Sequence, residues 1–285
     1  MTFRMTHAAA LIAFTAATPA LAQDQAAAMG FALAEDGMTL VVMPDAADPA
    51  TVETHELDTM LHAIAWRPVT GELLGLGAGT IYGIDPATGA LTDLEASFME
   101  DATIADGAKV AFDFNNAIDA VRAVSSAGDN LVYFPAGFGD GDERAGSVRR
   151  FTDAYYAEGD AHAGTEPMIF ANAYTNAISG AKAGSTAQFA LDAETDALVS
   201  LANNDGTLMT IGKVTVDGAE VDLSAWGGMD ILSPEEGTDM AWAILQMEGA
   251  DTAGLYEIDL ATGAATMQAD LGMGGFTGFA VAPAM

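Results

Sequence analysis

The sequence has 285 residues, no cysteine, and 41 acidic against 9 basic residues, which gives a formal net charge of −32 at pH 7. The absence of cysteine excludes disulfides, thiolate metal sites and covalent haem attachment. The negative charge disfavours nucleic acid and anionic membranes as partners, because both repel a strongly acidic protein.

The first 22 residues have the features of a secretory signal peptide. Arg4 supplies a positive start, residues 8–18 form a short apolar run, and residues 19–22 place small side chains before a cleavage site. The apolar run is much shorter than the ~20 residues that cross a bilayer. We therefore expect residues 1–22 to be removed on export to the periplasm or the medium. Residues 23–285 are expected to form one domain without a membrane span.

One stretch occurs twice, as IYGIDPATGAL at residues 81–91 and LYEIDLATGAA at residues 255–265. The alternating residues at its start predict a strand. Its aspartate and glycine predict a turn, in which the carboxylate bonds back to the backbone and the glycine adopts a left-handed conformation. Looser strand-and-turn copies place further turns near residues 45, 135 and 192.

A second set of short apolar segments alternates with these turns, and each of its members ends in Pro or Asn. The segments are residues 62–68, 110–116, 171–176, 227–234 and 277–283. A period of about 50 residues with this strand-rich composition is typical of β-propeller blades. We predict an all-β propeller with five blades, although the wider spacing at residues 136–167 and 201–226 leaves room for a sixth.

The two ends of the chain are complementary in this scheme. The segment at residues 277–283 has no strands after it, and the strands at residues 31–57 have no inner strand before them. We therefore expect the C-terminal strand to join the N-terminal blade and close the ring, which removes an open sheet edge.

Several phrases together resemble a secreted bacterial family named domain of unknown function 4394. They are AIAWRPVTGELLGLG, IYGIDPATGALT, AFDFNNAIDAVRAVSSAGDNLVYFP, ANAYTN and NNDGTLMTIG. The resemblance implies a secreted, propeller-like protein and carries no catalytic residues, since the family has no assigned activity. Ala65 stands where the family commonly has an acidic residue. Val132 stands where it commonly has a basic one.

Stacking the inner strands places Ala65, Asp113, Tyr174, Asp230 and Ala280 in one column. Two carboxylates beside a central channel can act as acid and base or hold a hard cation such as calcium. They can equally be buried acceptors for backbone N–H groups of adjacent blades. Tyr174, with Asn176 near the end of the same strand, is a candidate ligand-binding residue.

The loop at residues 137–146 gathers Asp140, Asp142 and Glu143 among glycines. Oxygen ligands on such a loop suit calcium, although Gly and Asp are also common at exposed turns. We expect no other cofactor. His55, His62 and His162 lack metal-ligand spacing and are interpreted as isolated.

These observations favour a secreted, non-catalytic propeller that binds a small molecule, a glycan or another exported protein. One alternative is a carbohydrate-active enzyme, similar to glycoside hydrolases, that uses Asp113 and Asp230. The other is an extracytoplasmic structural protein that calcium stabilises.

Overall fold

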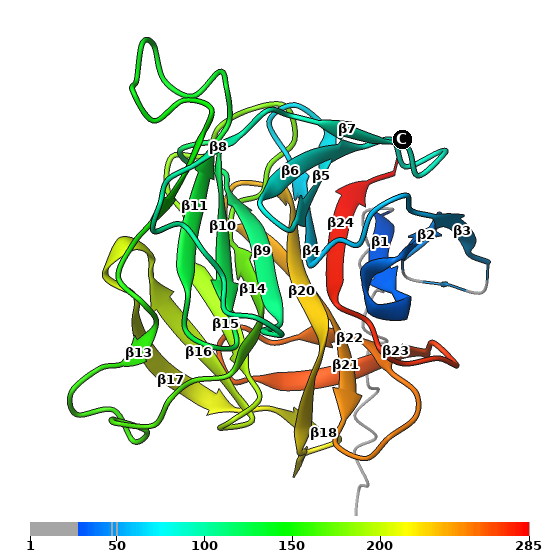
Figure 1. Ribbon diagram of the computed structural model, residues 1–285. Coiled ribbons are helices and arrows are strands. Elements are labelled where there is room, and N and C mark those ends of the chain that lie inside the picture. The colour runs from blue at the N-terminus through cyan, green and yellow to red at the C-terminus, as the bar shows by residue number, and fades with distance from the viewer. Residues whose placement is uncertain (1–27, 47, 50, 285) are drawn as a thin grey trace, which may run out of the picture.

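The computed structural model describes residues 28–46, 48–49 and 51–284, which form five small β-sheets arranged in a ring (Figure 1). The predicted signal peptide lies outside the described residues. We number the blades 1 to 5 in chain order. Their innermost strands are β24 (Gly278–Pro283), β4 (Ala63–Arg67), β9 (Val110–Asn115), β14 (Ile169–Tyr174) and β20 (Leu223–Glu235). The sheet count confirms the all-β prediction and five blades.

The other strands of each blade follow outward along the chain. Blade 1 continues with β1 (Ala28–Ala34), β2 (Thr39–Met43) and β3 (Glu53–Glu56), and blade 2 with β5 (Glu72–Gly77), β6 (Thr80–Ile84) and β7 (Leu91–Asp93). Blade 3 continues with β10 (Ala120–Ser125), β11 (Asn130–Phe134) and β12 (Ser147–Arg150), and blade 4 with β15 (Gln188–Asp192), β16 (Ala197–Ala202) and β17 (Thr207–Lys213). Blade 5 continues with β21 (Thr238–Met247), β22 (Gly254–Ile258) and β23 (Ala264–Asp270).

Short strands add to the outer edges of three blades, and two 3₁₀ turns complete the described elements. The added strands are β8 (Ser97–Phe98) on blade 3, β13 (Tyr155–Tyr156) on blade 4, and β18 (Thr215–Val216) with β19 (Ala219–Glu220) on blade 5. The turns are η1 (Glu35–Gly37) and η2 (Asn203–Asp205). Within the described residues, no helix is long and apolar enough to cross a membrane.

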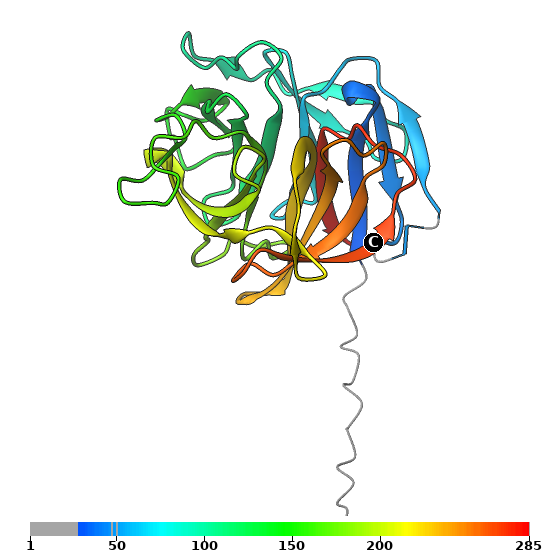
Figure 2. The ribbon, with the colours of Figure 1, turned by 90° about the horizontal axis from the view of Figure 1, so that it is seen from below.

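The ring closes as the sequence predicts. The C-terminal β24 pairs antiparallel with β1, from Ala28 opposite Pro283 to Leu33 opposite Gly278. Both views show the red C-terminal strand beside the blue N-terminal strand (Figures 1 and 2). Blade 1 is therefore built from both ends of the chain, and no sheet edge stays open at the joint.

The repeated sequence stretch forms the same turn twice, between the third and fourth strands of blades 2 and 5. Asp85 Oδ1 accepts a hydrogen bond from the Ala87 N–H (2.9 Å), and Asp259 Oδ1 accepts one from the Ala261 N–H (2.8 Å). The glycines four residues after each aspartate have φ angles of 73° and 81°. Glycine is favoured there because other L-residues rarely adopt a positive φ. The turn predicted from the sequence is confirmed.

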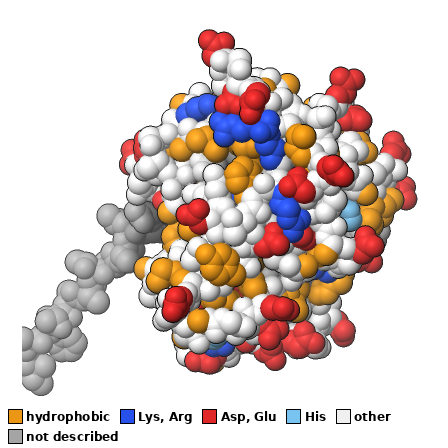
Figure 3. Space-filling model, turned by 60° about the vertical axis from the view of Figure 1, so that its left-hand side comes forward, with side chains coloured by type: hydrophobic (Ala, Val, Ile, Leu, Met, Phe, Trp, Pro, Cys, Tyr) orange, Lys and Arg blue, Asp and Glu red, His pale blue; other side chains and the backbone are white. Residues whose placement is uncertain are grey.

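Apolar side chains fill the interfaces between blades, because alternate residues of an inner strand face opposite neighbours. On β9, Phe112 and Phe114 pack against blade 2, whereas Ala111 packs against blade 4. Five apolar clusters of this kind join the five pairs of neighbouring blades. Most charged residues lie nearer the surface, and acidic side chains are scattered over the visible face (Figure 3).

Candidate functional site

Asp113 and Asp230 are buried on inner strands and make equivalent contacts. Asp113 Oδ2 accepts a hydrogen bond from the Tyr174 N–H of blade 4 (2.6 Å), and Asp230 Oδ2 accepts one from the Val281 N–H of blade 1 (2.7 Å). Asp230 Oδ1 also accepts the Ile231 N–H at 2.6 Å. Each carboxyl group thus satisfies a backbone donor on the innermost edge of the next blade, where the sheet supplies no partner.

Burial in the ring raises the pKa of both carboxyl groups. The pKa of Asp113 lies well above its ordinary value because of burial and, secondarily, the negative charge of Asp230. Burial raises the pKa of Asp230 to about 7. The side chains of Asp113 and Asp230 are only 3% and 4% exposed, and neither lines the cavities described below.

The Tyr174 side chain points toward blade 3, whereas Asp113 and Asp230 point toward the next blade along the chain. Its hydroxyl accepts a hydrogen bond from Arg122 Nε of blade 3 at 2.8 Å, and its ring is fully buried. Ala173 packs toward blade 5, as Asp113 packs toward blade 4. The column expected from the sequence is therefore offset by one residue in blade 4, where Ala173 occupies the equivalent position.

Asn176 holds a loop together through every polar atom of its side chain. Its Nδ2 donates to the Ser185 carbonyl (2.8 Å), and its Oδ1 accepts the Gly237 N–H (2.7 Å). Its own N–H donates to Asp239 Oδ1 at 2.8 Å. These bonds give Asn176 a structural role in the loop, and ligand binding by this residue stays a prediction.

The acidic loop predicted as a calcium site contains two ion pairs. Asp142 accepts two side-chain hydrogen bonds from Arg144, at 2.9 and 2.7 Å, and these lower the pKa of Asp142 to about 2. Glu143 lies 3.7 Å from Arg149, and Asp140 is exposed. Throughout the part of the chain that the structure describes, no three histidine or acidic side chains are grouped as metal ligands.

A cleft of about 750 Å³ opens at the end of the ring where the inner strands begin. Three of its lining residues directly precede inner strands: His62 precedes β4, Lys109 precedes β9 and Thr277 precedes β24. The connection from β8 to β9 crosses this end of the molecule and forms one wall. The fold therefore brings together residues from blades 1, 2 and 3 that are far apart in the sequence.

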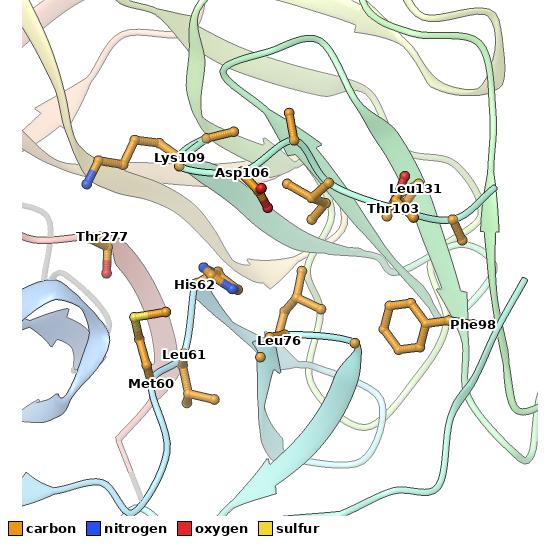
Figure 4. Close-up of a pocket in the computed structure, with 18 of the residues that line it drawn as sticks. Met60, Leu61, His62, Leu76, Phe98, Thr103, Asp106, Lys109, Leu131 and Thr277 are labelled. Atoms are coloured by element: carbon orange, nitrogen blue, oxygen red, sulfur yellow. The ribbon is translucent and has the colours of Figure 1, made fainter. Parts of the chain in front are cut away.

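The walls of the cleft are mostly apolar. The largest apolar side chains that line it are Leu61, Leu76, Phe98, Ile104 and Leu131. Figure 4 places Phe98 and Leu131 toward one end of the cleft and Lys109, His62 and Thr277 toward the other. Met60 and Leu61 lie beside Thr277 and His62, so the polar end also has apolar walls.

The polar end carries groups without close partners. The Thr277 hydroxyl oxygen is buried and has no hydrogen-bond partner among the described residues. Burial, with the nearby charge of Lys109, lowers the pKa of His62, so its imidazole is neutral at pH 7. Burial also lowers the pKa of Lys109, although Asp36 opposes this effect. Thr277, His62 and Lys109 thus line this end of the cleft together.

A much smaller cavity of about 10 Å³ lies on the axis of the ring between the inner strands. Among its lining residues is Asn172, which is 1% exposed and whose amide nitrogen and oxygen have no partner among the described residues. A cavity of this size has room for about one water molecule. At this level the inner strands therefore leave little free space on the axis.

The cleft was not predicted from the sequence, in which His62 was interpreted as isolated and the candidate residues lay on inner strands or in the loop at residues 137–146. The signal was present in the residues immediately before those strands, where His62, Lys109 and Thr277 are polar in otherwise apolar segments. In a propeller, the starts of all inner strands meet at one end, so these positions converge.

The fold and site define a β-propeller with a cleft at one end, and the chain is similar to several solved structures at low identity. A protein of unknown function from Bacteroides thetaiotaomicron VPI-5482 is 12% identical (TM-score 0.47; 75% of this chain and 52% of that chain covered). An auxiliary nutrient binding protein from the same organism is also 12% identical (TM-score 0.42; 75% and 55% covered). A chain of a nidogen/laminin complex is 11% identical (TM-score 0.45; 90% and 99% covered).

The chain spans about half the length of the two Bacteroides chains that it matches. No curated protein matches it. The family model described as "Domain of unknown function (DUF4394)" matches residues 41–280, and the chain belongs to this family.

Proposed function

We propose that this protein is an exported, non-catalytic propeller that binds a small molecule in the cleft where the inner strands begin. The observation that carries this proposal is the cleft itself, with a volume of about 750 Å³, apolar walls and a few convergent polar groups. Small-molecule sites typically have volumes of ~300–1,000 Å³ and this kind of lining.

The contacts of Asp113 and Asp230 support the non-catalytic part of the proposal. Both carboxyl groups accept backbone hydrogen bonds from the next blade and lie outside the cleft. A general acid must reach the substrate within hydrogen-bond distance, or through one water. The export part of the proposal depends on the signal-like features of residues 1–22.

The test is a thermal-shift screen of small molecules against the full chain and a variant with a blocked cleft. Ala108 is half-buried and lines the cleft, so Ala108→Trp should fill part of it. Ala261→Trp is the control, because Ala261 is exposed in the turn of blade 5. A ligand of the cleft raises the Tm of the wild type and of Ala261→Trp but not of Ala108→Trp. Compounds that stabilise all three proteins equally would bind elsewhere and contradict the proposal.

A further inference from the structure

We propose that the ligand of the cleft is an organic acid, with an apolar body and one anionic head group, and that the head group binds at the end formed by Lys109, His62 and Thr277. This inference rests on the proposed binding function and specifies the chemical class of the ligand. It follows from Lys109, which has no close carboxylate partner among the described residues, from the Thr277 hydroxyl, which has no hydrogen-bond partner among them, and from the apolar lining of the opposite end.

Lys109 differs from most cations of this acidic protein because no carboxylate neutralises it at close range. Arg67, Arg144, Arg149 and Arg150 each lie within 4 Å of a carboxylate oxygen. Lys109 has no such contact with a described residue, and its ammonium group lies over the Trp226 ring instead, 3.1 Å from the centroid. The indole face attracts the cation but leaves its N–H donors without a hydrogen-bond acceptor.

His62 lies close enough for the charge of Lys109 to lower its pKa. The charge of Lys109 disfavours the charged form of His62, and an anion placed near both side chains would offset this effect. No described hydrogen bond uses the imidazole ring of His62, so either ring nitrogen can contact a ligand. The bound anion would reverse the effect of Lys109 and raise the pKa of His62.

Thr277 supplies a neutral donor at the same end. Its hydroxyl oxygen is buried and unpartnered, and the residue is 9% exposed. A buried hydroxyl without a partner carries a desolvation penalty, which a carboxylate oxygen would remove by accepting its hydrogen bond. The threonine precedes β24, so closure of the ring holds its position.

The opposite end of the cleft suits an apolar body. Phe98 and Leu131 line it, and Figure 4 shows these side chains on the side away from Lys109, with Leu76 between the two ends. Two carboxylates also line the cleft, Asp36 and Asp106. Their negative charges oppose any anion and oppose a dianion more strongly, which favours a monoanion whose single charge lies beside Lys109.

The first experiment compares three ligands with the same eight-carbon chain: octanoate, octanol and octylamine. Isothermal titration calorimetry at about 0.15 M salt limits the long-range repulsion by the acidic surface, since the Debye length is then ~8 Å. We expect octanoate to bind about tenfold or more tightly than octanol, because a hydrogen bond to a charged group is stronger than a neutral one. Octylamine should bind most weakly.

The second experiment assigns the head group to Lys109. Lys109→Met should reduce octanoate affinity by about tenfold and leave octanol affinity nearly unchanged. Lys109→Arg keeps the charge and should retain the preference for octanoate. Lys182→Met is the matched control, because the Lys182 ammonium bonds to the Ile118 carbonyl and does not line the cleft.

A third measurement does not depend on any variant. NMR titration of His62 in the wild type should show a higher pKa with bound octanoate than without it, whereas octanol should cause little change. Lys109, Asp36 and Asp106 are the other ionisable groups that line the cleft, and all remain in place in both samples.

The outcomes separate the two proposals. If none of the three ligands binds, or if Ala108→Trp binds octanoate as well as the wild type does, the proposed binding function fails. If octanol or octylamine binds in the cleft as tightly as octanoate, the cleft is a binding site but the organic-acid inference is wrong. The same holds if Lys109→Met retains the full preference for octanoate.

Discussion

The ammonium group of Lys109 lies 3.1 Å from the centroid of the Trp226 ring. Lys109 directly precedes β9, the inner strand of blade 3, and Trp226 belongs to β20 of blade 5. Blades 3 and 5 are not neighbours in the ring, since blade 4 lies between them. This contact therefore connects two non-adjacent blades at the polar end of the cleft.

A double-mutant cycle on Lys109 and Trp226 should measure this connection. We expect Lys109→Met and Trp226→Leu each to lower the free energy of unfolding, with a coupling of about 1 kcal/mol between them. Urea denaturation of the wild type, both single variants and the double variant provides the values. Strictly additive effects would show that the cation and the ring do not stabilise each other.

The ring could be predicted from the sequence because its signals are local and repeated. The aspartate and glycine of each repeated turn determine the backbone conformation within a few residues, as Asp85 and Asp259 show. The cleft could not be predicted in this way, because the proximity of His62, Lys109 and Thr277 exists only after closure. The sequence of β14 also did not show which of its alternating side chains face blade 5. Ala173, and not Tyr174, occupies the position equivalent to Asp113 and Asp230.

The buried carboxyl group of Asp230 should make stability depend on pH. Its pKa is about 7 in the folded protein, against ~3.9 for an unfolded aspartate, so the folded state binds more protons between pH 4 and pH 7. The free energy of unfolding should therefore fall as the pH rises through this window and show no further change from this group above it. The pKa of Asp113 is also raised, so this group changes stability in the same direction.

Asp230→Asn cannot titrate at this position, so it should lose less stability than the wild type between pH 4 and pH 7. Urea denaturation at several pH values gives the two slopes. The control is Asp251→Asn, at an exposed aspartate, which should keep the wild-type slope. Equal slopes for Asp230→Asn and the wild type would refute a titrating buried group at this position.

Arg122 should be essential for the contact between blades 3 and 4. The residue is 4% exposed, and its side chain donates to the Tyr174 hydroxyl (2.8 Å), to Asn130 Oδ1 and to Asn204 Oδ1 (2.8 Å). We expect Arg122→Met to lower the free energy of unfolding by about 2–4 kcal/mol, because it leaves buried acceptors unpaired.

Arg149→Met is the matched control for Arg122→Met. Arg149 lies near the surface, and its pair with the exposed Glu143 should contribute less than about 1 kcal/mol. Both variants are compared with the wild type by urea denaturation. If Arg122→Met is no less stable than Arg149→Met, the buried network does not hold the two blades together.

Calcium should not stabilise the loop that contains Asp140, Asp142 and Glu143. Two of these carboxylates already contact arginines, and Asp142 is held in its charged form by Arg144. A calcium ion would have to compete with those pairs. We expect no change in Tm on adding millimolar calcium or EDTA. A Tm increase that EDTA reverses and that Asp142→Asn abolishes would establish a calcium site instead.

Gly228 should be required for closure of the ring, because its backbone approaches that of β24. A Cβ atom added at Gly228 would lie 2.5 Å from the Phe279 nitrogen and 2.9 Å from the Phe279 Cβ, so the two inner strands would have to separate. Gly228→Ala should therefore lower the free energy of unfolding by about 1–3 kcal/mol, the usual cost of overpacking. At Gly137 an added Cβ meets no atom within 4 Å, and Gly137→Ala should change stability little or increase it slightly. Urea denaturation of the two alanine variants tests the geometry of closure, and equal stability would mean that β20 and β24 do not pack this closely.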